Sequence, residues 1–156
     1  GPEREAFAAG LARYGESDLL TYRSDSPEAL VRRQADAWDP LLVWARRRFD
    51  VDFLVTTGVA PVDQPRNTIE RLQHAVAVLD AFTLAGLSPL VTVGGSLVAG
   101  LAVLEQAVSA EDVWAAVTLD ESWQLEKWGG DAEAELALAN RRADFFAGAK
   151  FLELIR

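Results

Sequence analysis

The sequence predicts an all-α fold: a compact bundle of crossed, or orthogonal, helices with at most one short extended segment near residues 51–59. Apolar residues recur mostly at helical spacing, and Pro, Gly and Ser separate the periodic stretches. Half of the 156 residues are hydrophobic, which is enough for a single domain with a substantial core. The predicted helices differ in length, and this favours crossed packing over parallel packing.

The amino-terminal stretch predicts a short helix over residues 2–14. Phe7 and Leu11 are one helical turn apart and should both point inward, and Gly15 ends the helix. Residues 17–24 lack a helical pattern, so we expect a loop or an extended stretch there.

A long helix should follow this loop. Ser26 is suited to cap it, and Pro27 occupies the first helical position, where no amide hydrogen is needed. Pro40 interrupts the pattern, because proline lacks an amide hydrogen and disfavours helical geometry at the preceding Asp39. We therefore expect either a kink or a fresh helix start at Asp39.

The middle of the chain contains the only strand-like piece. Residues 51–61 are rich in β-branched side chains and end in Gly58 and Pro61, which indicates a short extended segment. Residues 65–82 return to helical spacing. His74 falls on the polar side of this helix with no second metal ligand at a suitable spacing, so we expect a surface histidine and no metal site.

Residues 81–104 carry no charge and could span a bilayer, which takes about 20 residues. The flanking residues are the acidic Asp80 and Glu105, and Pro and Gly interrupt the run. We therefore expect a buried central helix and no membrane insertion. Small residues should let neighbouring helices approach it closely: Gly95, Ser96, Ala99 and Gly100.

The last two helices are predicted over residues 109–129 and 131–155. An advance of about 100° per residue gives the first of them two apolar faces. One face holds Trp114, Val117, Leu125 and Trp128, and the opposite face holds Ala116, Leu119 and Trp123. Glu121 lies within the first face, and Gln124 lies at its edge.

A carboxylate in an apolar face is costly unless it has a partner, and two explanations for Glu121 remain open. Arg142 interrupts the inward face of the last helix, so a Glu121–Arg142 ion pair would satisfy both side chains. Alternatively, the face is partly exposed, and Glu121 and the tryptophans contact another protein, since tryptophan is enriched at binding hot spots.

Composition argues against several classes of function. The formal net charge of −9 repels phosphate backbones, so no nucleic-acid partner is expected. Cysteine is absent, which excludes disulfides and thiol chemistry and fits a reducing compartment. Carboxylates such as Asp120, Glu121 and Glu126 could in principle perform acid–base catalysis, but no glycine loop or catalytic constellation accompanies them. We expect no enzyme activity and no cofactor.

Several motifs together resemble a known family, the assembly chaperones of the ATP synthase alpha subunit. They are the run LDESWQLEKWG at residues 119–129, Gln34 with WDPLL at 38–42, TTG at 56–58 and GSL at 95–97. The resemblance extends in order over nearly the whole chain. Beyond residue 129 the chain departs from the mitochondrial members, so no acidic position is carried over from that part of the family.

The resemblance implies a molecular chaperone that binds the unassembled alpha subunit and prevents its aggregation or wrong pairing before alpha/beta assembly. The family's important acidic positions lie in its carboxyl-terminal helices, and Glu121 matches them best. Our hypothesis is that Glu121, Gln124, Trp128 and Trp38 lie at or beside the docking surface. The alternative is a structural or adaptor module of another complex, with the tryptophans in its core.

The resemblance also bears on domain organisation and location. Family members carry a β-rich amino-terminal domain, and this chain contains no methionine. We therefore expect residues 1–156 to be a single helical domain from the carboxyl-terminal part of a longer protein. We expect it to be monomeric and to work in the bacterial cytoplasm, or in the mitochondrial matrix if it is eukaryotic.

Overall fold

The computed structural model describes residues 1–156 and confirms the all-α prediction. Its helices and strands, in chain order, are α1 Pro2–Ala12, the 3-10 turns Arg13–Gly15 and Leu19–Thr21, β1 Tyr22–Arg23, α2 Glu28–Phe49, β2 Thr56–Thr57, α3 Arg66–Ala77, α4 Ala81–Gly94, α5 Leu97–Leu104, α6 Ala110–Val117, α7 Leu119–Trp128 and α8 Ala132–Ile155. No helix is both long enough and apolar enough to cross a bilayer.

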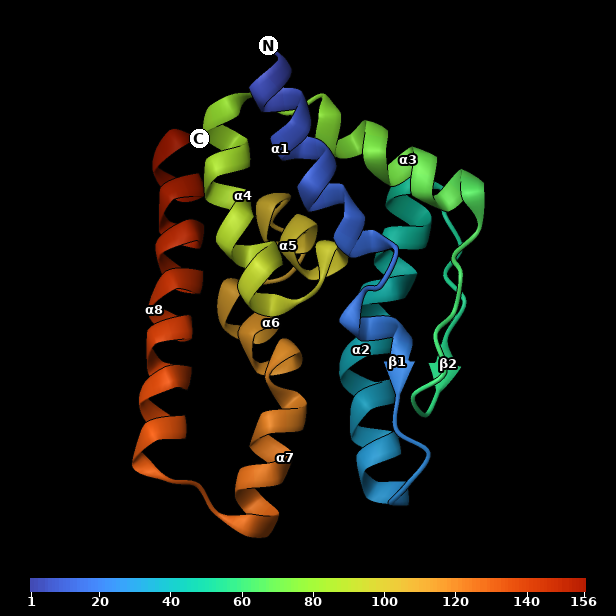
Figure 1. Cartoon of the computed structure of the whole chain (residues 1–156), viewed down its shortest axis with the longest axis vertical. Coiled ribbons are helices and arrows are strands. Elements are labelled where there is room, and N and C mark those ends of the chain that lie inside the picture. The colour runs from blue at the N-terminus through green and yellow to red at the C-terminus, as the bar shows by residue number, and fades with distance from the viewer.

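The short helix α5 lies at the centre of the bundle (Figure 1). It contacts α2, α4, α6 and α8, and every residue from Leu97 to Val103 is buried. The helix α1 crosses over α3 and α4, and α8 runs alongside α4 at the edge of the molecule. The crossed arrangement expected from the unequal helix lengths is therefore the one observed.

Glycines allow the central helices to approach closely. A side chain at Gly100 of α5 would lie 2.6 Å from Val91 of α4, as the small-residue pattern predicted. A second close approach, between α4 and α8, was not predicted. There a β-carbon at Gly148 would lie 2.7 Å from the carbonyl oxygen of Gly86.

The uncharged run from residue 81 to 104 forms two helices instead of one. Gly95 adopts a left-handed conformation, with φ of +72°, and ends α4. Ser96 then caps α5 by accepting a hydrogen bond from the Ala99 amide at 3.0 Å. A buried Asp18 accepts a hydrogen bond from the Val98 amide at 3.0 Å, so two side chains satisfy the start of α5.

One prediction about the first half of the chain needs correction. Residues 51–61 are not the only extended piece, because Thr56–Thr57 pairs in parallel with Tyr22–Arg23. Of the two alternatives expected at Pro40, the fresh start at Asp39 is excluded, because the helix α2 continues through Pro40. Packing of its buried face, which includes Trp38, Leu41 and Leu42, outweighs the loss of one intrahelical hydrogen bond.

The carboxyl-terminal third of the chain also differs from the sequence prediction in one respect. The predicted helix over residues 109–129 is divided at Thr118, whose hydroxyl donates to the Trp114 carbonyl at 2.7 Å. On the inward face of α8, Phe145, Gly148 and Leu152 are buried.

Candidate partner-binding surface

The helix α7 lies between α2 and α8 (Figure 1). Its core contacts come from Leu119 and Trp123, the two residues of α7 that are buried. The Trp123 ring lies beneath the Arg33 guanidinium, 4.9 Å from its centroid, and beside the Lys127 ammonium at 4.7 Å. These two cation–π contacts hold the Trp123 ring in place.

Polar contacts attach α7 to α2. The Arg33 guanidinium forms an ion pair with Glu126 at 3.0 Å, and the Gln34 amide donates to Asp120 at 2.8 Å. Gln34 is itself buried and also accepts from the Ser24 amide at 2.9 Å. Asp120 and Glu126 are therefore engaged within the molecule and position α7 against α2.

On the other side of α7, Glu121 forms an ion pair with Arg141 of α8, with 2.9 Å between Oε2 and a guanidinium nitrogen. The predicted partner Arg142 instead stacks on Phe146, 4.5 Å from the ring centroid. Arg141 and Arg142 are about 100° apart around α8, and both flank its inward face. Helical periodicity alone therefore does not tell which of the two arginines reaches Glu121. The Glu121 and Arg141 side chains remain 39% and 42% exposed, so neither is a buried charge.

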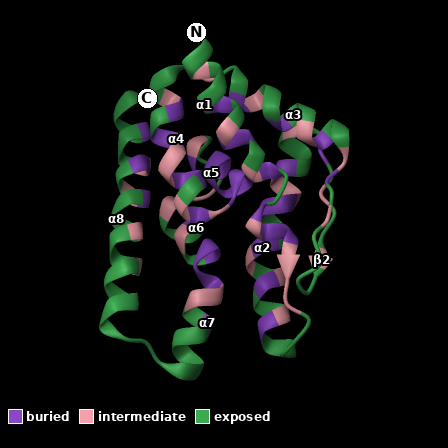
Figure 2. Cartoon of the chain, in the orientation of Figure 1, coloured by how far each residue is buried: buried purple, intermediate pink, exposed green.

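From Glu121 onward, α7 and the amino-terminal half of α8 extend away from the centre of the bundle, although Trp123 remains buried. We call these segments, residues 121–144, the α7–α8 arm. Figure 2 shows most of the arm as exposed, in contrast to the buried centre of the bundle. Trp128 is 81% exposed and Leu136 is 63% exposed, so the arm presents large apolar side chains to solvent.

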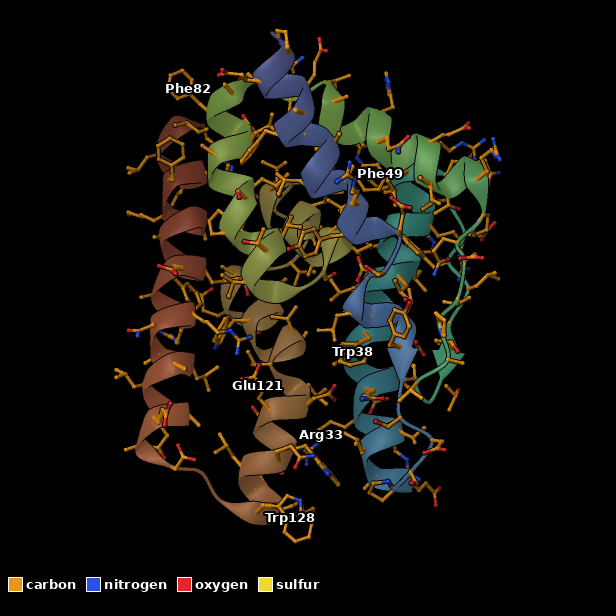
Figure 3. The ribbon with its side chains drawn as sticks, viewed as in Figure 1. Arg33, Trp38, Phe49, Phe82, Glu121 and Trp128 are labelled. Atoms are coloured by element: carbon orange, nitrogen blue, oxygen red, sulfur yellow. The ribbon has the colours of Figure 1, made fainter.

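Two of the predicted site residues lie on the arm beside the ion pair. Trp128 lies at the free end of α7, and Figure 3 shows it pointing away from the core. Gln124 is exposed one turn before Trp128. Glu121, Gln124 and Trp128 therefore lie on one accessible side of α7, and Arg141 joins them through its ion pair with Glu121 without having been predicted.

The structure does not place Trp38 in this region. Trp38 is completely buried, and its indole nitrogen donates to the Ala116 carbonyl at 2.8 Å. Its expected position at the docking surface is therefore wrong for this conformation. Trp114 also leaves the predicted apolar face, because the break at Thr118 directs it onto Phe145, with 5.2 Å between ring centroids.

The arm is acidic around its apolar side chains. Asp131, Glu133 and Glu135 are exposed in the first turn of α8, and Asp131 caps the helix by accepting from the Ala134 amide at 2.7 Å. Carboxylates at a helix amino terminus are stabilised by the helix dipole. The surface can thus offer apolar contact, a polarisable indole and negative charge to a second protein.

These features indicate a class of protein. Exposed tryptophan and leucine beside acidic side chains on a small helical bundle are typical of a protein-binding module.

Comparison with known proteins identifies the family. The sequence model of the ATP12 chaperone protein family matches residues 1–46. The crystal structure of Atp12 from Paracoccus denitrificans is similar over the whole chain, with a TM-score of 0.96, 44% identity and 67% of that chain covered. A protein from Agrobacterium tumefaciens has a TM-score of 0.92 and 37% identity, with 59% of that chain covered. The chain therefore belongs to the ATP12 chaperone family, as the sequence motifs indicated.

A mitochondrial member shows the same relationship at greater distance. Protein atp12 of Schizosaccharomyces pombe is 23% identical over 138 residues, which are 85% of this chain. The chain spans only 47% of the length of that relative.

Proposed function

We propose that this chain is an ATP synthase assembly chaperone that binds the unassembled alpha subunit of the catalytic head. It prevents aggregation or wrong pairing until the beta subunit takes its place. Membership of the ATP12 chaperone family supports the chaperone role. The observation that supports a docking surface is the α7–α8 arm, which exposes Trp128 and Gln124 on the side of α7 that carries the Glu121–Arg141 ion pair.

The physical argument concerns what an unassembled subunit exposes. Its future interface is apolar, and it aggregates or pairs wrongly unless another surface covers it reversibly. Burying one tryptophan removes about 150–250 Å² from water, which gives the arm a strong anchor. The energetic cost of ordering both surfaces keeps the net affinity below that of a permanent interface.

This role needs no covalent step and no bound cofactor, because occlusion alone protects the alpha subunit. The compartment would be the one in which the catalytic head assembles, the bacterial cytoplasm or the mitochondrial matrix. Protein atp12 of S. pombe is described as mitochondrial, and the structural relatives come from bacteria.

Co-expression tests the proposed partner. The tagged chain is produced with separate alpha and beta subunits, and the amount of each subunit retained is measured. We expect retention of alpha and not of beta. Equal retention of the two subunits, or failure to retain alpha, contradicts the proposal.

Substitution of Trp128 tests the proposed surface. Trp128→Ala should reduce alpha retention at least about tenfold while leaving the melting temperature nearly unchanged, because the ring is 81% exposed and acts as a hot spot only in the complex. Phe82→Ala is the matched control, since Phe82 is 69% exposed and lies at the opposite end of the molecule (Figure 3). A larger loss for the control variant would place the docking surface at that end.

Substitution of Glu121 separates a structural role from a binding role. Glu121→Gln breaks the ion pair with Arg141, and an exposed pair contributes only about 0.2–1 kcal/mol to folding. We expect a small decrease in melting temperature and a clear loss of alpha binding. Arg142→Gln is the control on the neighbouring position, because Arg142 contacts Phe146 and not Glu121. Unchanged alpha binding by Glu121→Gln would limit Glu121 to holding the arm.

A further inference from the structure

A second concave surface lies between α2 and the α6–α7 segment, and we call it the α2–α6 groove. Its volume is about 490 Å³, within the range of about 300–1,000 Å³ typical of binding pockets. Its floor is apolar and is made by Ala37, Leu41, Ala116 and Leu119. Leu119 precedes Glu121 by two residues and so points about 200° away from it around α7. The groove is therefore separate from the surface that Glu121 shares with α8.

The rim of the groove carries two carboxylates without ion-pair partners. Asp36 on α2 and Asp112 on α6 are both exposed, and neither belongs to any of the ion pairs in the structure. Arg33 also lines the groove, but Glu126 neutralises it at 3.0 Å and Trp123 stacks on it. The local charge available to a ligand is therefore negative.

Pro40 adds a backbone acceptor at the same place. Proline has no amide hydrogen, so the Asp36 carbonyl lacks the donor that residue 40 would supply in a regular helix. Helical carbonyls point toward the carboxyl end, so this oxygen points toward Pro40, which also lines the groove. A ligand with N–H donors could satisfy an acceptor that the fold leaves without its usual partner.

We propose that the α2–α6 groove binds a protein segment that places a lysine or arginine side chain between apolar side chains. The cation would lie between Asp36 and Asp112 and donate to the Asp36 carbonyl, while the apolar neighbours cover Leu41, Ala116 and Leu119. Charge complementarity selects this occupant over an acidic one. The open shape along two helices suits an extended or helical segment. The proposal does not require the alpha subunit to be the partner.

Labelled peptides test this proposal by fluorescence anisotropy. One short peptide contains Leu, Ala and Arg, and its counterpart has Glu in place of each Arg. We expect the basic peptide to bind at least about tenfold more tightly than the acidic one, with an affinity that falls as salt rises. The double variant Asp36→Asn with Asp112→Asn should weaken binding of the basic peptide by about tenfold.

The matched control is the double variant Asp25→Asn with Asp63→Asn, which changes the net charge equally at exposed acids away from the groove. It should leave the affinity nearly unchanged, and circular dichroism checks that all variants remain folded. Ala115→Trp, which adds bulk at an exposed lining position, should also weaken binding. Three results would each overturn the proposal: equal affinity for the two peptides, equal weakening by the control variant, or loss of peptide binding in Trp128→Ala instead of in the groove variants.

Discussion

At the scale of single residues, the most constrained carboxylate is Asp18, which has no exposed surface. Burial raises the pKa of Asp18 to about 6, although hydrogen bonds from Ser96, Val98, Leu20 and Leu97 act in the opposite direction. Its oxygens accept from the Leu20 and Val98 amides at 3.0 Å each, so it links the loop after α1 to the start of α5. The charge on this side chain therefore affects the stability of the core.

The raised pKa of Asp18 predicts how stability changes with pH. In the folded state the Asp18 carboxyl keeps its proton up to about pH 6, whereas in the unfolded chain it loses the proton near pH 3.9. The stabilisation that the protonated Asp18 gives to the folded state is therefore complete below about pH 4. It is lost as the pH rises through 6, and its size is on the order of 3 kcal/mol. Urea unfolding between pH 4 and 7 should show this decline in the wild type and a flatter curve in Asp18→Asn. A wild-type free energy of unfolding that changes with pH as in the variant would contradict the assignment.

The positions of the candidate site residues were only partly predictable from the sequence. Glu121, Gln124 and Trp128 stand out because a carboxylate within an apolar helical face is unusual, and their role in binding stays a prediction. Trp38 was misplaced because tryptophan suits both cores and interfaces, and only the three-dimensional contact with Ala116 shows which applies. Arg33 and Gln34 contact α7 from 86 or more residues away along the chain, and no local pattern records such contacts.

At the scale of whole elements, the crossing of α4 and α8 depends on glycine. In Gly148→Ala the new β-carbon would lie 2.5 Å from Pro89 and 2.7 Å from the Gly86 carbonyl oxygen, and backbone atoms cannot move aside easily. We expect a loss of about 1–3 kcal/mol in the free energy of unfolding, as for other overpacked sites. Gly10→Ala in α1 is the control, because nothing lies within 4 Å and alanine favours helix by about 0.5–1 kcal/mol. Urea denaturation of both variants should give opposite signs, and equal effects would contradict this account of the crossing.

Helix existence was easier to predict than helix ends. The helices over residues 2–14, 65–82 and 131–155 were expected from periodicity and correspond to α1, α3 and α8. The breaks at Gly95 and Thr118 depend on caps and tertiary contacts, such as the bond from Thr118 to the Trp114 carbonyl, and these do not alter the hydrophobic period. For Tyr22–Arg23 the sequence predicts only a loop or an extended stretch. It does not predict a strand there, because the pairing partner Thr56–Thr57 lies far away along the chain.

At the scale of the whole molecule, the two halves of α8 should differ in their local stability. Its carboxyl-terminal half packs on α4, whereas residues 132–140 are almost entirely exposed. Amide hydrogen exchange should therefore be faster in residues 132–140 than in residues 145–155, because local opening there disrupts few tertiary contacts. Addition of the alpha subunit should slow exchange in the arm. Equal protection of both halves in the free chain would contradict the view that residues 132–140 lack supporting contacts.

The length of α8 has a geometric consequence for the width of the space beside α7. The helix is uninterrupted over 24 residues, and Gly148 at the crossing with α4 is about 24 Å from its amino-terminal end, at 1.5 Å per residue. A change in the angle between α8 and α4 at the contact of Gly148 with Gly86 would therefore move the amino-terminal end of α8 most. A tilt of about 5° at that contact displaces the far end by about 2 Å. The angle at the glycine crossing therefore helps to set how far the exposed side chains of α8 stand from those of α7.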